Sequence, residues 1–296
     1  MTVKNKLLTV LAVFIILLLL AGAGAFKADT AKGGVKDISG VKTLGGIESA
    51  MPENSALVFF GSTLGKTLSG YKAYKNMDAL LFALKSGEVD AVWTCDVTAD
   101  FLIRKEMGLN KLNISGMADI QKTKDARFEF GMALKDTEAS KKLKDEIDTV
   151  LSGMKSDGSL GEIVQKYVYS AVDYETEEGK DKRLYASDMR SSSGKNTIYV
   201  GITGAVPPIN MLDEDGKPYG FCVALMDEIG MRLGRGIEFV VLDNETAFTS
   251  LMKGKVDLIF SYGTGMITTE NKKNYIMTEG YYPMERYEFL IYGENN

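Results

Sequence analysis

The sequence ALKSGEVDAV at residues 83–92 decides the fold, and a related sequence, SLMKGKVDLI, follows at residues 250–259. Each reads as the end of an amphipathic helix, a glycine that stops the helix, and a short apolar strand. Gly87 and Gly254 suit the position just after a helix, where a positive φ costs little without a Cβ. The Val-Asp pair followed by apolar residues is typical of a strand that enters a buried parallel sheet. Two such segments predict two related α/β lobes.

The composition narrows the classes of function. A chain of 296 residues, 45% hydrophobic and 25% charged, is long enough for two lobes of ordinary size. Its net charge of −5 argues against a nucleic-acid partner. The sequence contains no histidine, which excludes Ser-His and Cys-His catalytic pairs and histidine-ligated zinc. Its two cysteines are too few for a cysteine-rich metal site, and we expect two buried free thiols rather than a disulfide. We therefore expect neither a metal nor a cofactor.

Residues 1–26 read as a signal peptide or a membrane anchor. Lys4 and Lys6 precede an apolar run at residues 7–26, and two Ala-Gly-Ala sequences at residues 21–25 offer cleavage patterns. The run is also long enough to span a bilayer, so cleavage and retention both stay open. In either case we expect an extracytoplasmic protein, anchored by residues 7–26 if the segment is retained. Residues 27–46 lack an apolar period and are predicted to form a tether.

Residues 47–172 form the first predicted lobe. Its apolar residues 56–60 read as a strand that leads into Gly61, Ser62 and Thr63, which would open a helix with its free N–H groups facing an anion. The alternative is a simple N-cap without a ligand. Asp96 follows the strand at residues 89–94, at the strand end where ligands gather in open α/β sheets, unless it only caps the next helix. Polar residues 173–195 are predicted to link this lobe to a second one at residues 196–296.

The second lobe resembles the N-terminal half of the family 3 extracellular solute-binding proteins, which have the type II periplasmic binding protein fold. The matching motifs are GAVPPI at 204–209, DGK at 215–217, GF at 220–221, LMKGKVD at 251–257, ITTEN at 267–271 and GYY at 280–282. The first lobe resembles the family's C-terminal half through GST at 61–63, LKSGEVDAV at 84–92 and DGSLGEIVQKY at 157–167. Because the C-terminal type of lobe comes first, the two lobes of this α/β fold appear in circularly permuted order. A gene fusion or a truncated tandem array would give the same order of lobes.

The resemblance implies a ligand site between the lobes. It assigns hydroxyl donors to Ser62, Thr63 and Thr268 and an amine-binding carboxylate to Asp96. The arginine that clamps a ligand carboxylate in the family is replaced by Asn271, beside Lys272, and neither side chain reproduces the planar fork of arginine.

The aromatic residue that follows Pro-Pro in the family is replaced by Ile209. The resemblance leaves Tyr262, Tyr281 or Trp93 as the candidates for an aromatic wall of the site.

The preferred interpretation is a monomeric, non-enzymatic solute-binding protein. Its lobes would close on a small polar ligand such as an amino acid, and an ABC permease would recognise the closed form. One alternative is a membrane-tethered sensor or interaction domain that has lost transport. Another is a periplasmic dehydratase on the same fold, but no converging pair of carboxylates is apparent, and we assign no catalytic residue.

Overall fold

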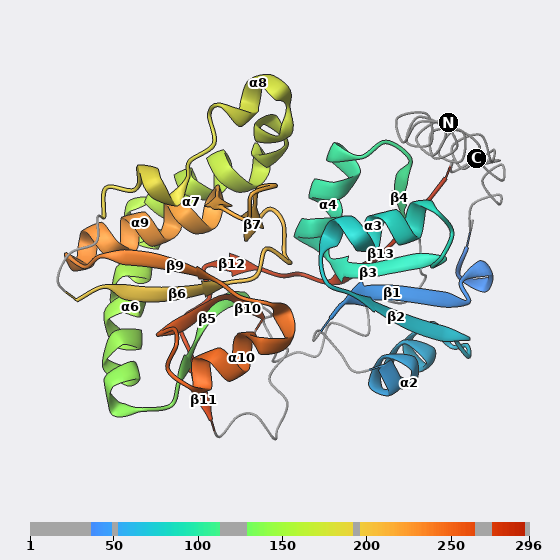
Figure 1. The fold of residues 1–296 in the computed structure, drawn as a ribbon, viewed down its shortest axis with the longest axis horizontal. Coiled ribbons are helices and arrows are strands. Elements are labelled where there is room, and N and C mark those ends of the chain that lie inside the picture. The colour runs from blue at the N-terminus through green and yellow to red at the C-terminus, as the bar shows by residue number, and fades with distance from the viewer. Residues whose placement is uncertain (1–36, 49–52, 113–128, 192–195, 264–273, 294–296) are drawn as a thin grey trace, which may run out of the picture. The chain divides into compact units, whose positions relative to one another are not determined.

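The computed structural model describes residues 37–48, 53–112, 129–191, 196–263 and 274–293 (Figure 1). The chain divides into residues 1–33 and residues 34–296, and the described residues all belong to the second unit. The predicted signal or anchor therefore lies outside the described part of the chain. Within that part, no helix is long and apolar enough to cross a membrane.

The first sheet, sheet A, contains five strands in the order β2-β1-β3-β13-β4. They are β1 (Thr43–Ile47), β2 (Gly70–Tyr74), β3 (Ala91–Cys95), β4 (Leu109–Lys111) and β13 (Tyr287–Tyr292). Strand β1 is parallel to β2 and β3, whereas β13 runs antiparallel to β3 and β4. Helices α3 (Met77–Lys85) and α4 (Asp96–Lys105) cover one face, and α2 (Glu53–Leu64) covers the other (Figure 1). We call sheet A and these helices lobe A; the short helix η1 (Ile38–Gly40) precedes β1.

The second sheet, sheet B, has its main strands in the order β11-β5-β10-β6-β9. They are β5 (Glu129–Lys135), β6 (Ile198–Ile202), β9 (Ile237–Val241), β10 (Leu258–Gly263) and β11 (Tyr275–Met277), and β12 (Tyr282–Pro283) pairs with β5. One face is covered by α6 (Glu138–Asp157), α7 (Ser159–Val164) and α9 (Phe221–Leu233), and the other by α10 (Asn244–Met252) (Figure 1). A small hairpin, β7 (Met211–Leu212) and β8 (Pro218–Tyr219), precedes α9. These elements make lobe B.

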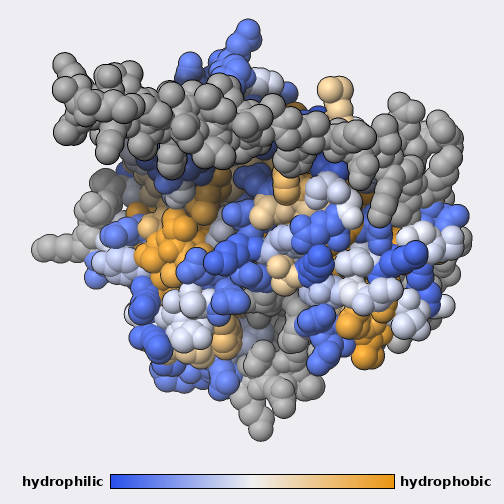
Figure 2. Space-filling model, turned by 45° about the vertical axis from the view of Figure 1, so that its right-hand side comes forward, coloured by the Kyte–Doolittle hydropathy of each residue, from blue (hydrophilic) through white to orange (hydrophobic). Residues whose placement is uncertain are grey.

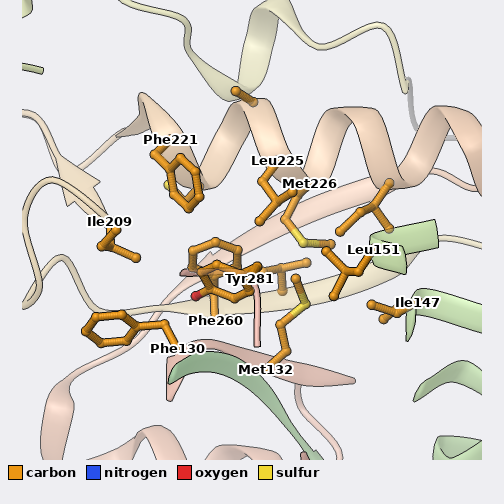
Figure 3. Close-up of a cluster of buried hydrophobic side chains, with 14 of the residues drawn as sticks. Phe130, Met132, Ile147, Leu151, Ile209, Phe221, Leu225, Met226, Phe260 and Tyr281 are labelled. Carbon is orange, nitrogen blue, oxygen red and sulfur yellow. The ribbon is translucent and has the colours of Figure 1, made fainter. Parts of the chain in front are cut away.

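The core of lobe B shows why these segments form strands and helices. In β5, Met132 and Leu134 belong to the cluster under α6 and α9, whereas Ala133 belongs to the cluster under α10. This alternation is the period of a strand buried on both faces. In α6, the buried residues Ile147 and Leu151 lie one helical turn apart and point into the first cluster (Figure 3). The α/β class with two sheets is therefore confirmed.

The structure divides the chain differently from the predicted lobes at 47–172 and 196–296. Strand β5 and helices α6 and α7, predicted in the first lobe, lie with sheet B, whereas β13 from the end of the chain lies in sheet A. Strand β1 forms inside the predicted tether at 27–46. Each sheet therefore contains one antiparallel strand that comes from a distant part of the sequence, which local patterns do not reveal.

The predicted strand at 56–60 is wrong, because these residues lie in α2. Ala56 and Phe60 are buried four residues apart, and Val58 between them is 71% exposed. That spacing is helical, since alternate residues of a half-buried strand would share one environment. Strand β1 is the strand that precedes this helix.

The predicted linker at 173–195 also differs, because much of it is ordered against both lobes. It contains η3 (Ala171–Glu175), α8 (Glu177–Lys180) and η4 (Ala186–Asp188), and η2 (Gln165–Tyr169) precedes it. Glu175 accepts hydrogen bonds from Lys105 of α4 at 2.9 Å and from the Tyr219 hydroxyl of β8 at 2.6 Å. Glu175 also pairs with Arg183 at 2.9 Å, and both of these side chains are about nine-tenths buried. This segment is therefore held in place by buried charged residues, which a search for apolar periodicity does not detect.

Most large apolar side chains are buried, with exceptions such as Phe82 and Met107, which are 71% and 93% exposed. The face drawn in Figure 2 is mainly hydrophilic, and its apolar side chains gather in separate patches.

Candidate functional site

A cavity of about 240 Å³ lies between lobe A and lobe B. Its walls are mainly apolar, and the aromatic residues among them are Trp93, Phe130, Phe248, Phe260 and Tyr287. Its polar lining residues come from both lobes and are Glu48, Thr94, Cys95, Thr203, Asn244, Glu245 and Ser261. Both lobes therefore contribute aromatic and polar side chains to one site.

The wall from lobe A is a fixed aromatic cluster around Trp93. The Trp93 indole N–H donates to the hydroxyl of Tyr71 at 3.3 Å, and its ring meets Tyr287 edge-on at 5.1 Å between centroids. Gly46 makes room for this arrangement, because a Cβ there would lie 2.5 Å from Trp93 Nε1 and would also collide with Tyr71. These contacts on several sides hold the indole in place at the cavity wall.

The wall from lobe B contains an unusual backbone conformation at Ser261. Its φ is 63°, a region that residues with a Cβ rarely adopt, and the pairing of β10 with β5 shifts register between Ile259 and Tyr262. The hydroxyl of Tyr281 donates to Ser261 Oγ at 3.3 Å, and the Tyr281 ring stacks on Phe260 at 5.0 Å. A backbone conformation of this kind costs free energy and persists only where surrounding contacts hold it. Such residues cluster at ligand and active sites, which supports a functional role for this end of β10.

Polar contacts join the lobes beside the cavity. Thr98 Oγ1 of α4 donates to the carbonyl oxygen of Pro207 at 2.6 Å in a buried position. On α10, Asn244 Nδ2 donates to the carbonyl oxygen of Lys75 at 3.1 Å. The described arrangement is thus one in which the two lobes touch.

Asp96, a predicted ligand, instead holds the segment that crosses from lobe B to lobe A. It is the first residue of α4, and its Oδ2 accepts a hydrogen bond from the backbone N–H of Glu285 at 3.0 Å, while its own N–H donates to the carbonyl oxygen of Arg286. Burial raises the pKa of the Asp96 carboxyl and outweighs the backbone hydrogen bonds from Val97 and Glu285, which lower it. Asp96 is not among the described residues that line the cavity.

The other predicted site residues that lie in the described part of the chain are not brought together. Ser62 and Thr63 lie near the end of α2 rather than at a helix start after a strand, so the predicted anion corner is wrong. Ile209 is fully buried and points into the core of lobe B beside Phe130, so it does not form a wall of the cavity (Figure 3). Tyr262 lies in β10, where its backbone pairs with Gly131.

Three of the predicted ligands, Thr268, Asn271 and Lys272, lie outside the described residues. Of the residues proposed as the aromatic wall, Trp93 lines the cavity, whereas Tyr281 is buried and does not line the cavity.

The sequence interpretation missed several lining residues. Glu48 directly follows β1, so recognising residues 43–47 as a strand would have placed it at a strand end. Glu245 and Phe248 lie one turn apart at the start of α10, which a helix assignment there would have indicated. Tyr287 begins β13, and no local signal connects that strand to the cavity.

Both cysteines are buried free thiols, as predicted. Cys95 donates to Thr98 Oγ1 at 3.2 Å, and Cys222 donates to the carbonyl oxygen of Tyr219 at 3.5 Å. Burial raises the pKa of both thiols, that of Cys222 to about 12. The Cys95 thiol at the cavity is therefore uncharged at neutral pH, which does not suit a nucleophile.

A wider hollow of about 660 Å³ lies on the surface of lobe B between α6 and α9. Both arginines of its lining are paired: Arg235 with Glu146 at 3.4 Å, and Arg232 with Asp157 at 2.8 Å. Because these ions are already paired and open to water, the cavity between the lobes is the better candidate site.

The fold and the cavity define an α/β protein with two lobes and a site between them. Residues 198–295 match the sequence model of the bacterial extracellular solute-binding proteins, family 3. The predicted resemblance to this family is confirmed for that segment. No curated protein sequence matches the chain significantly.

Several solved structures resemble the chain. The ligand-binding component of an ABC-type import system from Staphylococcus aureus is 10% identical over 85% of this chain and 66% of its own, with a TM-score of 0.41. A truncated, arginine-bound ArgBP from T. maritima is 32% identical over 27% of this chain and 36% of its own, with a TM-score of 0.22. An ancestral arginine-binding protein bound to arginine is 12% identical over 86% of both chains, with a TM-score of 0.39. The chain spans less than two thirds of the first two proteins.

Proposed function

We propose that this protein is an extracytoplasmic solute-binding protein, which captures a small solute between its lobes for uptake by an ABC permease. The observation that carries the proposal is the cavity, because aromatic and polar side chains from both lobes line it. A ligand that touches both lobes favours the closed form, which gives a permease a state to recognise. The family match over residues 198–295 supports the same class of function.

The proposal is for binding without catalysis. Among the described lining residues, the thiol of Cys95 and the phenol of Tyr287 are both held neutral, since burial raises the pKa of each, that of Tyr287 to about 12. The family that matches consists of binding proteins.

We further propose that the lobes are in circularly permuted order. The family match lies in the second half of the chain, although it includes the motifs that the resemblance assigns to the family's N-terminal half. The ordered segment at residues 165–191 would then be the connection between the former ends. Its contacts with α4 and with β8, through Glu175, support that role.

The binding proposal is tested by a thermal-shift screen of amino acids, amines and small organic acids, followed by calorimetry on each hit. We expect at least one solute to stabilise the protein. Replacing Ala205, which lines the cavity, by Trp should abolish the shift by filling the space. Ala139→Trp is the matched control, because Ala139 is exposed on α6. A well-folded protein with no ligand in a broad screen, or a hit that survives Ala205→Trp, would argue against the proposed site.

A further inference from the structure

Within the described lining of the cavity, every charged side chain is negative. Glu48 and Glu245 are its carboxylates, and no lysine or arginine is among the described lining residues. Cys95 and Tyr287 stay neutral at pH 7, as shown above. An anionic group in the cavity would therefore meet negative charge without a described partner, which costs free energy in a partly desolvated site.

The two carboxylates come from different lobes. Glu48 directly follows β1 in lobe A, where its backbone N–H donates to the carbonyl oxygen of Tyr74, and it is half-buried. Glu245 lies in the first turn of α10 in lobe B and is exposed; its charge is favourable at the start of a helix. No hydrogen bond or ion pair within the described residues involves either side chain. Both carboxylates are therefore available to a cation that reaches both lobes.

The aromatic walls also favour a positively charged ligand. Trp93, Tyr287, Phe130, Phe248 and Phe260 line the cavity from both lobes. An aromatic face attracts an ammonium or guanidinium group within about 6 Å of the ring centre, and most strongly when water is excluded. The same rings bury the apolar part of a ligand. The volume of about 240 Å³ limits the occupant to a small molecule.

We propose that the ligand is a small organic cation without a carboxylate, such as an amine, a guanidine or a quaternary ammonium compound. Its charged group lies between Glu48 and Glu245, and its apolar part lies against the aromatic walls. This inference rests on the proposed solute-binding function and narrows the class of solute. A cation that contacts both carboxylates joins the two lobes, so the ligand's charge itself favours the closed form.

The test uses pairs of probes that differ by one carboxylate: agmatine with arginine, and tyramine with tyrosine. Calorimetry on the purified protein should show that the amine of at least one pair binds about tenfold or more tightly than its amino acid. Glu48→Gln and Glu245→Gln should each weaken binding of that amine by about tenfold. The control is Glu238→Gln, which changes an exposed glutamate on β9 and should leave the affinity unchanged. Ala205→Trp should abolish binding, which places the amine in the cavity.

The results separate this inference from the proposed function. If an amino acid or another anionic solute binds more tightly than every amine, the protein is a solute-binding protein and the inference is overturned. The inference is also overturned if the amine binds equally well to both Gln variants, or if no amine binds while a neutral solute does. If no solute of any class binds to folded protein, both proposals fail.

Discussion

Lobe A and lobe B use the same sequence motif for the same structural purpose. The motif glycines, Gly87 and Gly254, have φ values of 73° and 70°. The motif aspartates then join neighbouring strands. Asp90 Oδ2 accepts from the backbone N–H of Lys42 at 2.9 Å and of Thr43 at 2.8 Å, just before and at the start of β1.

In lobe B, Asp257 Oδ2 accepts from the N–H of Tyr199 in β6 at 2.8 Å. The motif valines pack over a glycine of the same neighbouring strand. A Cβ at Gly45 would lie 3.2 Å from Val89, and a Cβ at Gly201 would lie 3.3 Å from Val256. The motif thus aligns β3 with β1 in sheet A and β10 with β6 in sheet B.

The difference between the lobes appears at the end of the strand that follows each motif, β3 in lobe A and β10 in lobe B. In lobe A, Asp96 after β3 binds the backbone of Glu285 and fixes the crossing into β13. In lobe B, Ser261 near the end of β10 has a positive φ and lines the cavity. Both strand ends therefore line the cavity, but the residue after β3 also fixes the crossing into β13, whereas β10 reaches the cavity through a residue with a positive φ. Similarity of motif predicts the scaffold but not the residues that follow it.

The largest expected effect comes from removing the motif leucine of either lobe. Leu84 and Leu251 are only 4% and 1% exposed. Replacing either by Ala should cost about 2–5 kcal/mol, because each change leaves a cavity in a packed core. Urea denaturation measures the loss, and Leu→Met at the same positions should cost less than about 1.5 kcal/mol. A large loss at one leucine and almost none at the other would show that the two lobes are not built alike.

Removing the motif aspartates should distinguish the lobes. Asp90→Ala leaves two backbone N–H groups without their acceptor and should cost about 2 kcal/mol, whereas Asp257→Ala affects one in an exposed position and should cost about 1 kcal/mol. Chemical denaturation of both variants measures this difference. The Asn variants keep an acceptor oxygen and should recover most of the stability. Equal losses for the two Ala variants would contradict the explanation based on the number of hydrogen bonds.

A smaller effect is expected at the motif glycines. Gly87→Ala and Gly254→Ala should each cost about 1 kcal/mol, because alanine is strained at positive φ although open space surrounds both positions. Gly161→Ala is the control: it lies in α7 with open space for a Cβ and no positive φ, so it should stabilise by up to about 1 kcal/mol. Thermal unfolding measures all three. A gain at Gly87 or Gly254 would exclude strain as the reason for glycine there.

The smallest effect is expected at the contact between the lobes through Lys105 and Glu175. Because Lys105 is about one-third exposed, Lys105→Ala should cost at most about 1 kcal/mol. Burial raises the pKa of Glu175, but hydrogen bonds from Tyr219 and Lys105 outweigh it, so the net shift is downward.

Glu175 therefore contributes to the free energy of unfolding at pH values above the ordinary pKa of a glutamate. This contribution is lost as the pH falls through the lowered pKa of Glu175 in the folded protein. Denaturation of the wild-type protein and of Lys105→Ala at several pH values should show that the difference between their free energies of unfolding becomes smaller in acid. A difference that is constant with pH would exclude the ion pair as its source.

The sequence predicted the regular parts of both lobes because their apolar periods are strong. Strand β3 follows Gly87 and strand β10 follows Gly254, as the two motif segments predicted. Strand β1 was missed because Gly45 and Gly46 interrupt its short apolar run. The helix α2 was mistaken for a strand because its apolar residues are contiguous. Among the candidate ligands of the site, the sequence suggested Trp93 but not Glu48 or Tyr287, since lining residues meet only when β13 and β1 join one sheet.

The position of β13 has a consequence for how the chain folds as it is synthesised. Strands β1 to β4 are made first, but β13 lies between β3 and β4, so sheet A remains incomplete until residues 287–292 have emerged. Sheet B contains β5, which is made before its partners β10 and β11, so it too waits for later residues. Neither lobe can finish folding before most of the chain exists, so both lobes stay incompletely folded until late in synthesis.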